Sequence, residues 1–203
     1  MPPPLTDYKQ ILKNSNMIDY QNLADSIKHY EKLGYTRIES PWLVPPCIDD
    51  ITKPADKKHY MLKHNDKCLV ASGEQSFLYL YLKENLPFGK FQTITPCFRD
   101  ERYDLTHEKY FMKNELIITD EVTDDNLQKI INDAFDFFKS KLYIGNNRLE
   151  VKRTDIGFDI EYKMGGVTPI ELGSYGIREC KFLKWIYGTG CAEPRLSKLQ
   201  TYG

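Results

Sequence analysis

The chain has 203 residues, with 28 basic and 29 acidic side chains and a formal net charge of -1. This length suits one domain with a substantial core, and the balanced charge gives no general attraction to nucleic acid beyond a local basic face. No apolar run reaches membrane-spanning length, and the beginning of the chain lacks a signal-peptide core. These features favour a cytoplasmic protein without a membrane partner.

The cysteines are odd in number and form no Cys-x-x-Cys pair, which is typical of reduced thiols in the cytosol. They are Cys47, Cys68, Cys97, Cys180 and Cys191. A zinc site built from three of them stays open as an alternative. Residues 45–65 are rich in Pro, Asp, Lys and His and predict a surface loop, in which we expect His59 and His64 to be solvated.

The first predicted element is a helix over residues 19–33, with apolar Leu23, Ile27 and Tyr30 at helical spacing. Gly34 follows where a C-cap glycine is expected. A short strand over residues 36–40 then leads to Pro41. By itself this pattern predicts an amphipathic helix packed on the core.

A strand over residues 67–72 and a helix over residues 73–82 come next. The run Ser72-Gly73-Glu74 opens the helix, where a carboxylate is favourable because it interacts with the positive end of the helix dipole. This capping explanation and a ligand-binding role for Glu74 are equally compatible with the sequence.

Two β-prone runs, residues 91–98 and 110–119, flank a charged segment without Gly or Pro. They predict antiparallel strands joined by a long polar loop, and such loops usually carry function. Arg99 can present a planar fork of donors to phosphate or carboxylate, and Glu101 projects to the same face. Phe111 could offer a flat apolar surface to a ring. The alternative is a solvated hairpin tip with a surface ion pair.

The last third of the chain predicts a helix over residues 124–139 and strands over residues 148–153 and 158–163. Residues 170–178 form another predicted strand, in which a carboxylate, small residues and Arg178 are unusual for plain core. Residues 188–196 read as a glycine-rich strand end followed by a helix, with Pro194 in its first turn.

Three of these segments, in this order, resemble the motifs of class II aminoacyl-tRNA synthetases. The helix, short strand and Pro41 resemble motif 1. Arg99 and Glu101, followed by His107, Phe111 and Glu115, resemble motif 2. The glycine-rich run ending in Arg195 resembles motif 3, although Ala192 replaces its third glycine. Residues Glu171, Ser174 and Arg178 resemble the strand before motif 3 in aspartyl- and asparaginyl-tRNA synthetases, and more closely that of ammonia-dependent asparagine synthetase.

The resemblance implies an α+β fold, an antiparallel sheet flanked by helices, in one catalytic domain over residues 1–203 without an anticodon-binding domain. It also implies a homodimer, because motif 1 builds the two-fold interface in that family.

The implied activity is ATP-dependent formation of an aminoacyl-adenylate. Arg99 and Arg195 would be catalytic and bind ATP, together with Glu101, His107, Phe111 and Glu171. Magnesium would bind at Glu171 and Ser174, and the substrate at Glu74, Ser174 and Arg178. Arg178 also suggests an acidic amino acid, because a guanidinium can bind a side-chain carboxylate through two hydrogen bonds.

The acceptor of the aminoacyl group is not specified by these motifs. We expect tRNA, as in a stand-alone synthetase-like ligase. Transfer to a carrier protein or to ammonia is one alternative, and a non-catalytic binding or regulatory subunit is another. The presence of Arg99, Glu101, Glu171 and Arg195 favours an enzyme, because non-catalytic relatives usually lose such residues.

Overall fold

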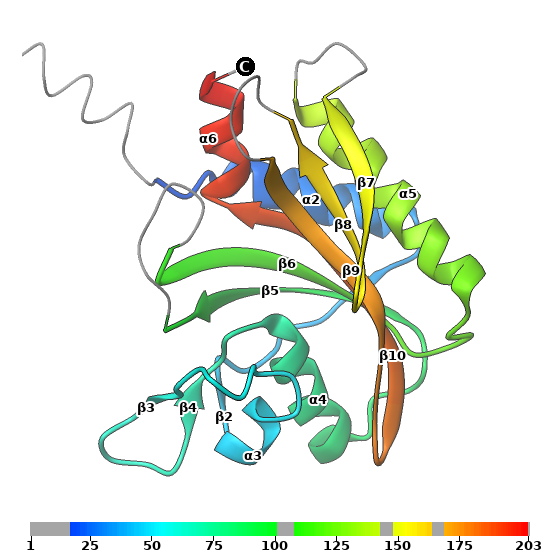
Figure 1. Cartoon of the computed structure of the whole chain (residues 1–203). Helices are drawn as coiled ribbons and strands as arrows, with labels where there is room; N and C mark the ends of the chain where they lie inside the picture. Colours follow the sequence, from blue (N-terminus) through cyan, green and yellow to red (C-terminus); the bar gives the residue numbers. More distant parts are fainter. Residues whose placement is uncertain (1–16, 101–107, 143–147, 164–168, 203) are drawn as a thin grey trace, which may run out of the picture.

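The computed structural model describes residues 17–100, 108–142, 148–163 and 169–202 and has an α+β architecture, with one large sheet flanked by helices (Figure 1). The large sheet contains, in spatial order, β1 (Thr36–Arg37), β5 (Lys90–Phe98), β6 (Tyr110–Ile118), β10 (Leu183–Glu193), β9 (Ile170–Cys180), β8 (Gly157–Tyr162) and β7 (Leu149–Thr154). All neighbouring strands are antiparallel except β1, which runs parallel to β5.

A small antiparallel sheet and the helices complete the described structure. The small sheet has the order β2 (Leu43–Val44), β4 (Cys68–Leu69) and β3 (Tyr60–Met61). The helices are α2 (Tyr20–Lys32), α3 (Pro46–Asp49), α4 (Gly73–Glu84), α5 (Asp124–Lys141) and α6 (Arg195–Tyr202). Within the described residues, no helix has both the length and the apolar character needed to cross a bilayer.

Both faces of the large sheet are covered, because alternate residues of a strand point to opposite faces. Leu116 and Ile118 of β6 belong to the core formed with α2, α5 and α6. Ile117 between them belongs to a second core formed with α3, α4 and the small sheet. In Figure 1, α2 and α5 accordingly lie across the sheet from α4. The second face carries the candidate site.

The helix that resembles motif 1 packs inside its own chain. Leu23 and Tyr30 have 2% and 0% of their surface exposed and belong to the main core. The packing alternative is therefore correct for these two side chains, which have no surface left for a two-fold interface. Ile27 is partly buried. The homodimer itself stays a prediction, and a partner would have to contact other side chains.

The segment predicted as a surface loop is more structured than expected. Residues 45–65 contain α3 and β3, and His59 is not simply solvated but contacts the carboxylates of Asp49 and Asp50. All five cysteines are free, and among the described residues no three of them come together to bind zinc. Pro194 precedes α6 rather than lying in its first turn.

Candidate active site

A cavity of about 260 Å³ lies on the second face of the large sheet, between the sheet, the start of α4 and the segment before β3. Six lysine or arginine side chains line it against three carboxylates, so it suits an anionic ligand. The cationic side chains are Lys53, Lys57, Lys58, Arg99, Lys113 and Arg178, and the acidic ones are Glu74, Asp100 and Glu171.

Strand alternation brings these side chains to one face. Lys113 and Glu115 of β6 lie on the same side as Ile117, and Thr189 and Tyr187 of β10 lie beside them in the sheet. A register shift in β10 between Thr189 and Cys191 ends this alternation, and Cys191 packs in the opposite core. The side chains of the sheet that line the cavity are therefore mostly polar, whereas those of the second core on the same face of the sheet are apolar.

Arg99 follows β5 and lines the cavity, as the sequence predicts. Its Nε donates a hydrogen bond to the carbonyl of Ala71 at 3.2 Å, and its guanidinium carbon lies 4.9 Å from the centre of the Phe111 ring. The backbone is fixed on both sides, because the Arg99 amide donates to the Lys109 carbonyl and Tyr60 Oη donates to the Arg99 carbonyl. These two hydrogen bonds fix the backbone from which the Arg99 guanidinium extends into the cavity.

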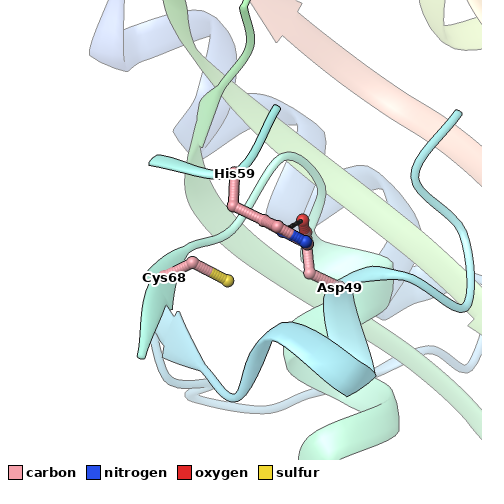
Figure 2. Close-up of side chains that lie close together, drawn as sticks. All are labelled: Asp49, His59 and Cys68. Atoms are coloured by element: carbon pink, nitrogen blue, oxygen red, sulfur yellow. Dashed lines mark hydrogen bonds and ion pairs between the residues drawn. The ribbon is translucent and has the colours of Figure 1, made fainter. Parts of the chain in front are cut away.

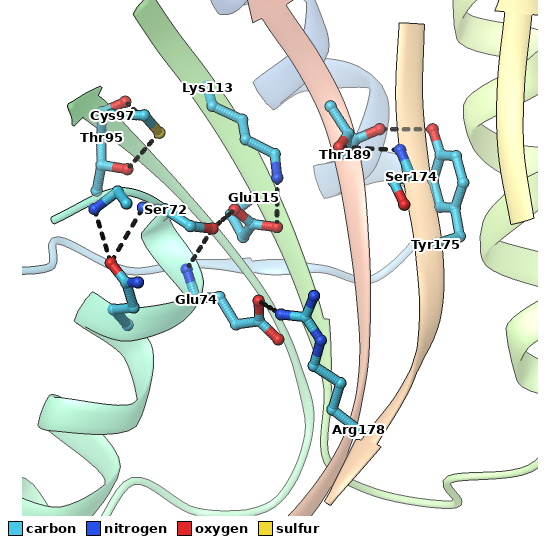
Figure 3. Close-up of polar contacts among 12 residues, drawn as sticks. Ser72, Glu74, Thr95, Cys97, Lys113, Glu115, Ser174, Tyr175, Arg178 and Thr189 are labelled. Carbon is cyan, nitrogen blue, oxygen red and sulfur yellow. Dashed lines mark hydrogen bonds and ion pairs between the residues drawn. The ribbon is translucent and has the colours of Figure 1, made fainter. Parts of the chain in front are cut away.

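Glu74 projects from the first turn of α4 and is 3% exposed. Gly73 permits this position, because a Cβ there would lie 2.9 Å from Glu115 Cβ. Trp185 Nε1 donates to Glu74 Oε1 at 2.6 Å. The Arg178 guanidinium donates to Oε2 at 2.5 Å (Figure 3). Glu74 and Arg178, two predicted substrate-binding residues, therefore form one ion pair. The N-cap is Ser72, and Glu74 lies in the first turn of α4, so a helix-dipole contribution from Glu74 stays compatible with its ion pair.

The pKa of Glu74 is raised to about 7, chiefly by burial; the Arg178 charge opposes this shift and the Glu115 charge adds to it. Because this folded pKa exceeds the usual 4.5, the folded protein holds a proton that the unfolded chain releases. That stabilisation is complete below the unfolded pKa and is lost as the pH rises through the folded one.

We therefore expect wild-type stability, relative to Glu74→Gln, to fall by roughly 3 kcal/mol as the pH rises from about 4.5 to 7. Urea unfolding of both proteins across this range measures the difference. Curves that stay parallel throughout the range would show that Glu74 remains ionised in the folded state.

A second buried pair lies beneath the cavity. Lys113 Nζ is 2.9 Å from Glu115 Oε1, and Ser72 Oγ donates to Glu115 Oε2 at 2.6 Å (Figure 3). Glu115 is completely buried and Lys113 is 8% exposed. Because Ser72 is also the N-cap of α4, this network ties the helix that carries Glu74 to the sheet.

Glu171 and Ser174 line the cavity at its β9 side. Arg195 lies next to them, because its Nη1 donates to the Glu171 carbonyl at 2.8 Å and lies 3.5 Å from Glu171 Oε1. Across the strand pairing, Asp159 faces Ser174. Burial and the nearby Glu171 charge raise the pKa of Asp159, while a hydrogen bond with Ser174 lowers it.

These oxygen atoms fit a magnesium ion. Mg²⁺ prefers oxygen ligands and is usually held by one or two carboxylates together with substrate phosphates. The repulsion between Asp159 and Glu171, which contributes to the raised pKa of Asp159, would be relieved by a divalent cation. In the part of the chain that the structure describes, the group of three donors close enough to hold a metal unaided lies elsewhere, near α3.

The structure brings together five of the predicted site residues around one cavity, namely Glu74, Arg99, Glu171, Ser174 and Arg178. Phe111 and Arg195 contact lining residues without lining the cavity themselves. Glu101 and His107 lie outside the described residues.

Several lining residues were missed by the sequence analysis. Lys53, Lys57 and Lys58 were assigned to a surface loop, although a run of lysines is itself a signal for phosphate contact. Tyr187, which lines the cavity, and Trp185, which donates to Glu74, gave no such signal, because aromatic residues in a strand predict core.

No protein-family model matches the sequence, and no curated protein matches it. Solved structures match the fold. The cytoplasmic seryl-tRNA ligase of Naegleria fowleri, solved with AMP, has a TM-score of 0.70 and 17% identity, over 90% of this chain and 54% of that one. The seryl-tRNA synthetase of Pyrococcus horikoshii, solved with ATP, has a TM-score of 0.68 and 16% identity, over 86% and 48% of the two chains.

A pyrrolysyl-tRNA synthetase from Desulfitobacterium hafniense is similar over 89% of this chain and 68% of its own, with a TM-score of 0.64 and 16% identity. The chain therefore has the fold of class II aminoacyl-tRNA synthetase catalytic domains. It spans about half the length of the two seryl enzymes. The more specific resemblance to aspartyl- and asparaginyl-tRNA synthetases stays a prediction.

Proposed function

We propose that this protein uses ATP to activate the carboxylate of an amino acid, forming an aminoacyl-adenylate. The observation that carries the proposal is that Arg99 lines the same cation-rich cavity as the buried carboxylate of Glu74. ATP and the substrate carboxylate are both anions, and the amino group of the substrate is a cation. A cavity with these two kinds of group can hold all three in one orientation.

The chemistry needs no general base, because a carboxylate is already an anionic nucleophile at neutral pH. One carboxylate oxygen attacks the α-phosphorus of ATP, and the bond from that phosphorus to the β-phosphate oxygen breaks, releasing pyrophosphate. The difficulty is to hold one anion against another and to stabilise the charge of the transition state. Arg99 can bridge the two reacting groups because its guanidinium offers several donors in a plane.

The leaving pyrophosphate would be bound by cationic side chains and by magnesium. Lys57 and Lys58 line the cavity and supply positive charge, and Arg195 would contact the γ-phosphate. Glu171 and Ser174, with Asp159 nearby, would hold magnesium, which when bound neutralises the charge that develops on pyrophosphate. For adenine to stack on the ring face of Phe111 that Arg99 now covers, the guanidinium of Arg99 must first move.

The amino acid would be held through its α-amino group at Glu74. An ammonium group there would favour the ionised carboxylate and so oppose the burial that raises the Glu74 pKa. Arg178 is already paired with Glu74 and lies 4.2 Å from the centre of the Tyr187 ring. An acidic substrate such as aspartate would therefore compete with Glu74 for Arg178. A panel of candidate substrates must therefore contain both acidic and neutral amino acids.

The acceptor we propose is tRNA, in line with the resemblance in sequence motifs and the names of the structural neighbours. A carrier-protein thiol or ammonia is the alternative within the same chemistry, since only the second step differs. A non-catalytic binding role is the third candidate. Retention of Arg99, Glu171 and Arg195 around one site disfavours it.

ATP–pyrophosphate exchange with a panel of amino acids tests the first step without knowledge of the acceptor. We expect magnesium-dependent exchange with one or a few amino acids and none when the amino acid is omitted. Folded protein that binds ATP but exchanges with no amino acid would indicate the non-catalytic role. Folded protein that does not bind ATP in the presence of magnesium would contradict the proposal.

A further inference from the structure

A second group of chemically reactive side chains lies outside the cavity. Asp49 at the end of α3, His59 before β3 and Cys68 in β4 approach one another from three separate elements (Figure 2). Their donor atoms, a carboxylate oxygen, an imidazole nitrogen and a thiol sulfur, all lie within 4.8 Å of one another. Neither the adenylation chemistry nor the core packing needs this combination.

The Asp49 carboxylate is the least satisfied member of the cluster. It is 1% exposed, and Oδ2 lies 2.7 Å from His59 Nδ1. Its other oxygen, Oδ1, is buried and accepts no hydrogen bond from any described residue. Burial raises the pKa of Asp49, while His59 and the nearby amide of Ala71 lower it; that amide donates to Gln75 Oε1 at 2.7 Å. A buried carboxylate oxygen without a partner is unfavourable, and a cation bound to it would stabilise it.

The other two donors are held in position. His59 Nε2 lies 3.1 Å from Asp50 Oδ1, which orients the ring so that Nδ1 faces Asp49. This arrangement of carboxylate, imidazole and a further donor is typical of histidines that bind metals. Cys68 is completely buried, and its thiol donates only to the Val44 carbonyl, at 3.4 Å. A buried thiol of this kind is out of reach of substrates, so a nucleophilic role is excluded.

We propose that Asp49, His59 and Cys68 bind a divalent transition-metal ion of the Zn²⁺ class. Oxygen, nitrogen and sulfur donors together suit Zn²⁺ and are unsuited to Mg²⁺ or Ca²⁺, which prefer oxygen alone. Two protons leave for solvent on binding, one from the Cys68 thiol and one shared between His59 and Asp49. The carboxylate and thiolate then balance the two charges of the metal. A water would complete four-coordination.

The role of this metal would be to fix the segment that covers the cavity. Asp49 and His59 bracket the segment that carries Lys57 and Lys58, both of which line the cavity. Tyr60, next to His59, donates its hydroxyl to the Arg99 carbonyl at 3.1 Å. The metal would thus anchor both ends of a cationic segment and hold it against the backbone of Arg99. This inference does not depend on the adenylation activity.

Titration of metal-free protein with Co²⁺ tests the site, because cobalt replaces zinc and is visible by absorption. We expect one ion per chain, with ligand-field bands of a tetrahedral site and a thiolate-to-cobalt charge-transfer band in the near ultraviolet. Cys68→Ser should lose the charge-transfer band, whereas Cys180→Ser should keep it. His59→Ala should lose tight binding, whereas His64→Ala, which changes an exposed histidine of the same segment, should bind as wild type does.

Two further measurements make the result independent of variants that fail to fold. Asp50→Asn keeps all three ligands and should weaken cobalt binding about 10- to 100-fold by removing the group that orients His59. Zn²⁺ at about a hundred times its dissociation constant should raise the melting temperature of the wild type by roughly 5–10 °C. Wild-type protein without a thiolate-to-cobalt band would overturn the proposal. So would a band that survives Cys68→Ser, or binding lost equally in His64→Ala, which would indicate surface histidines only.

Discussion

Arg99→Ala is expected to lower the rate of ATP–pyrophosphate exchange by about a hundredfold or more while the protein stays folded. The transition state would lose a charged donor at the reacting phosphorus, and a lost donor of this kind is worth roughly 3 kcal/mol. The effect on stability should be smaller, about 1 kcal/mol, because the folded protein loses one hydrogen bond to Ala71 and the contact with Phe111. Exchange kinetics and thermal melting of the same preparation separate the two effects.

Arg99→Lys distinguishes a directional role from a purely electrostatic one. An ammonium group keeps the charge but cannot bridge two oxygens in a plane, so we expect little recovery of exchange. Arg37→Ala is the matched control, because this arginine is half exposed and, within the described part of the chain, is paired only with exposed Glu39. It should exchange as wild type does. An Arg99→Ala protein with wild-type exchange would refute the catalytic role, and one that unfolds would show that Arg99 acts mainly in the structure.

Local sequence patterns were sufficient for most helices and strands of this fold. The helical repeat predicts residues 124–139, and α5 spans Asp124–Lys141 with Thr123 as its cap. Alternation predicts the strands that become β7 and β8, although their bounds differ by a residue or so. The prediction failed for the segment between Pro45 and β4. Its elements α3 and β3 are too short to show a periodicity; α3 packs on α4, and β3 pairs with β4 in the small sheet.

The sequence predicts which residues form the site better than it predicts how they contact one another. Glu74 and Arg178 were both candidates, but their ion pair joins residues 104 positions apart and depends on how α4 packs on the large sheet. The same limit explains His59, which the sequence predicts to be solvated in a surface loop. In the structure its imidazole reaches Asp49 across 10 positions, because α3 and β3 fold back on each other. Short-range patterns cannot reveal contacts of this kind.

Lys113→Met is expected to have the largest effect on stability, lowering the free energy of unfolding by about 3–5 kcal/mol. The substitution leaves the Glu115 carboxylate completely buried and, among the described residues, hydrogen-bonded only by the Ser72 hydroxyl. Methionine has a similar volume to lysine, so the loss arises from the unpaired charge and not from a cavity. Because domains are stable by only about 5–15 kcal/mol, urea unfolding should detect the change readily.

The double variant Lys113→Met/Glu115→Gln tests this explanation. Removing the second charge should restore at least half of the lost stability, because a buried pair replaced as a whole is far less costly than one that is broken. Lys184→Met, which changes an exposed lysine of β10, should stay within about 0.5 kcal/mol of wild type. If Lys113→Met alone were as stable as Lys184→Met, the carboxylate of Glu115 must find another partner.

The same double variant also separates structure from chemistry at Lys113, which lines the cavity beside Arg99. If Lys113 serves only to neutralise Glu115, recovery of stability should bring recovery of ATP–pyrophosphate exchange, because α4 and Glu74 return to their positions. If exchange stays low in a protein of restored stability, the ammonium group itself acts on the bound anions. We expect the first result, because Lys113 Nζ is already held by Glu115 at 2.9 Å and is almost completely buried.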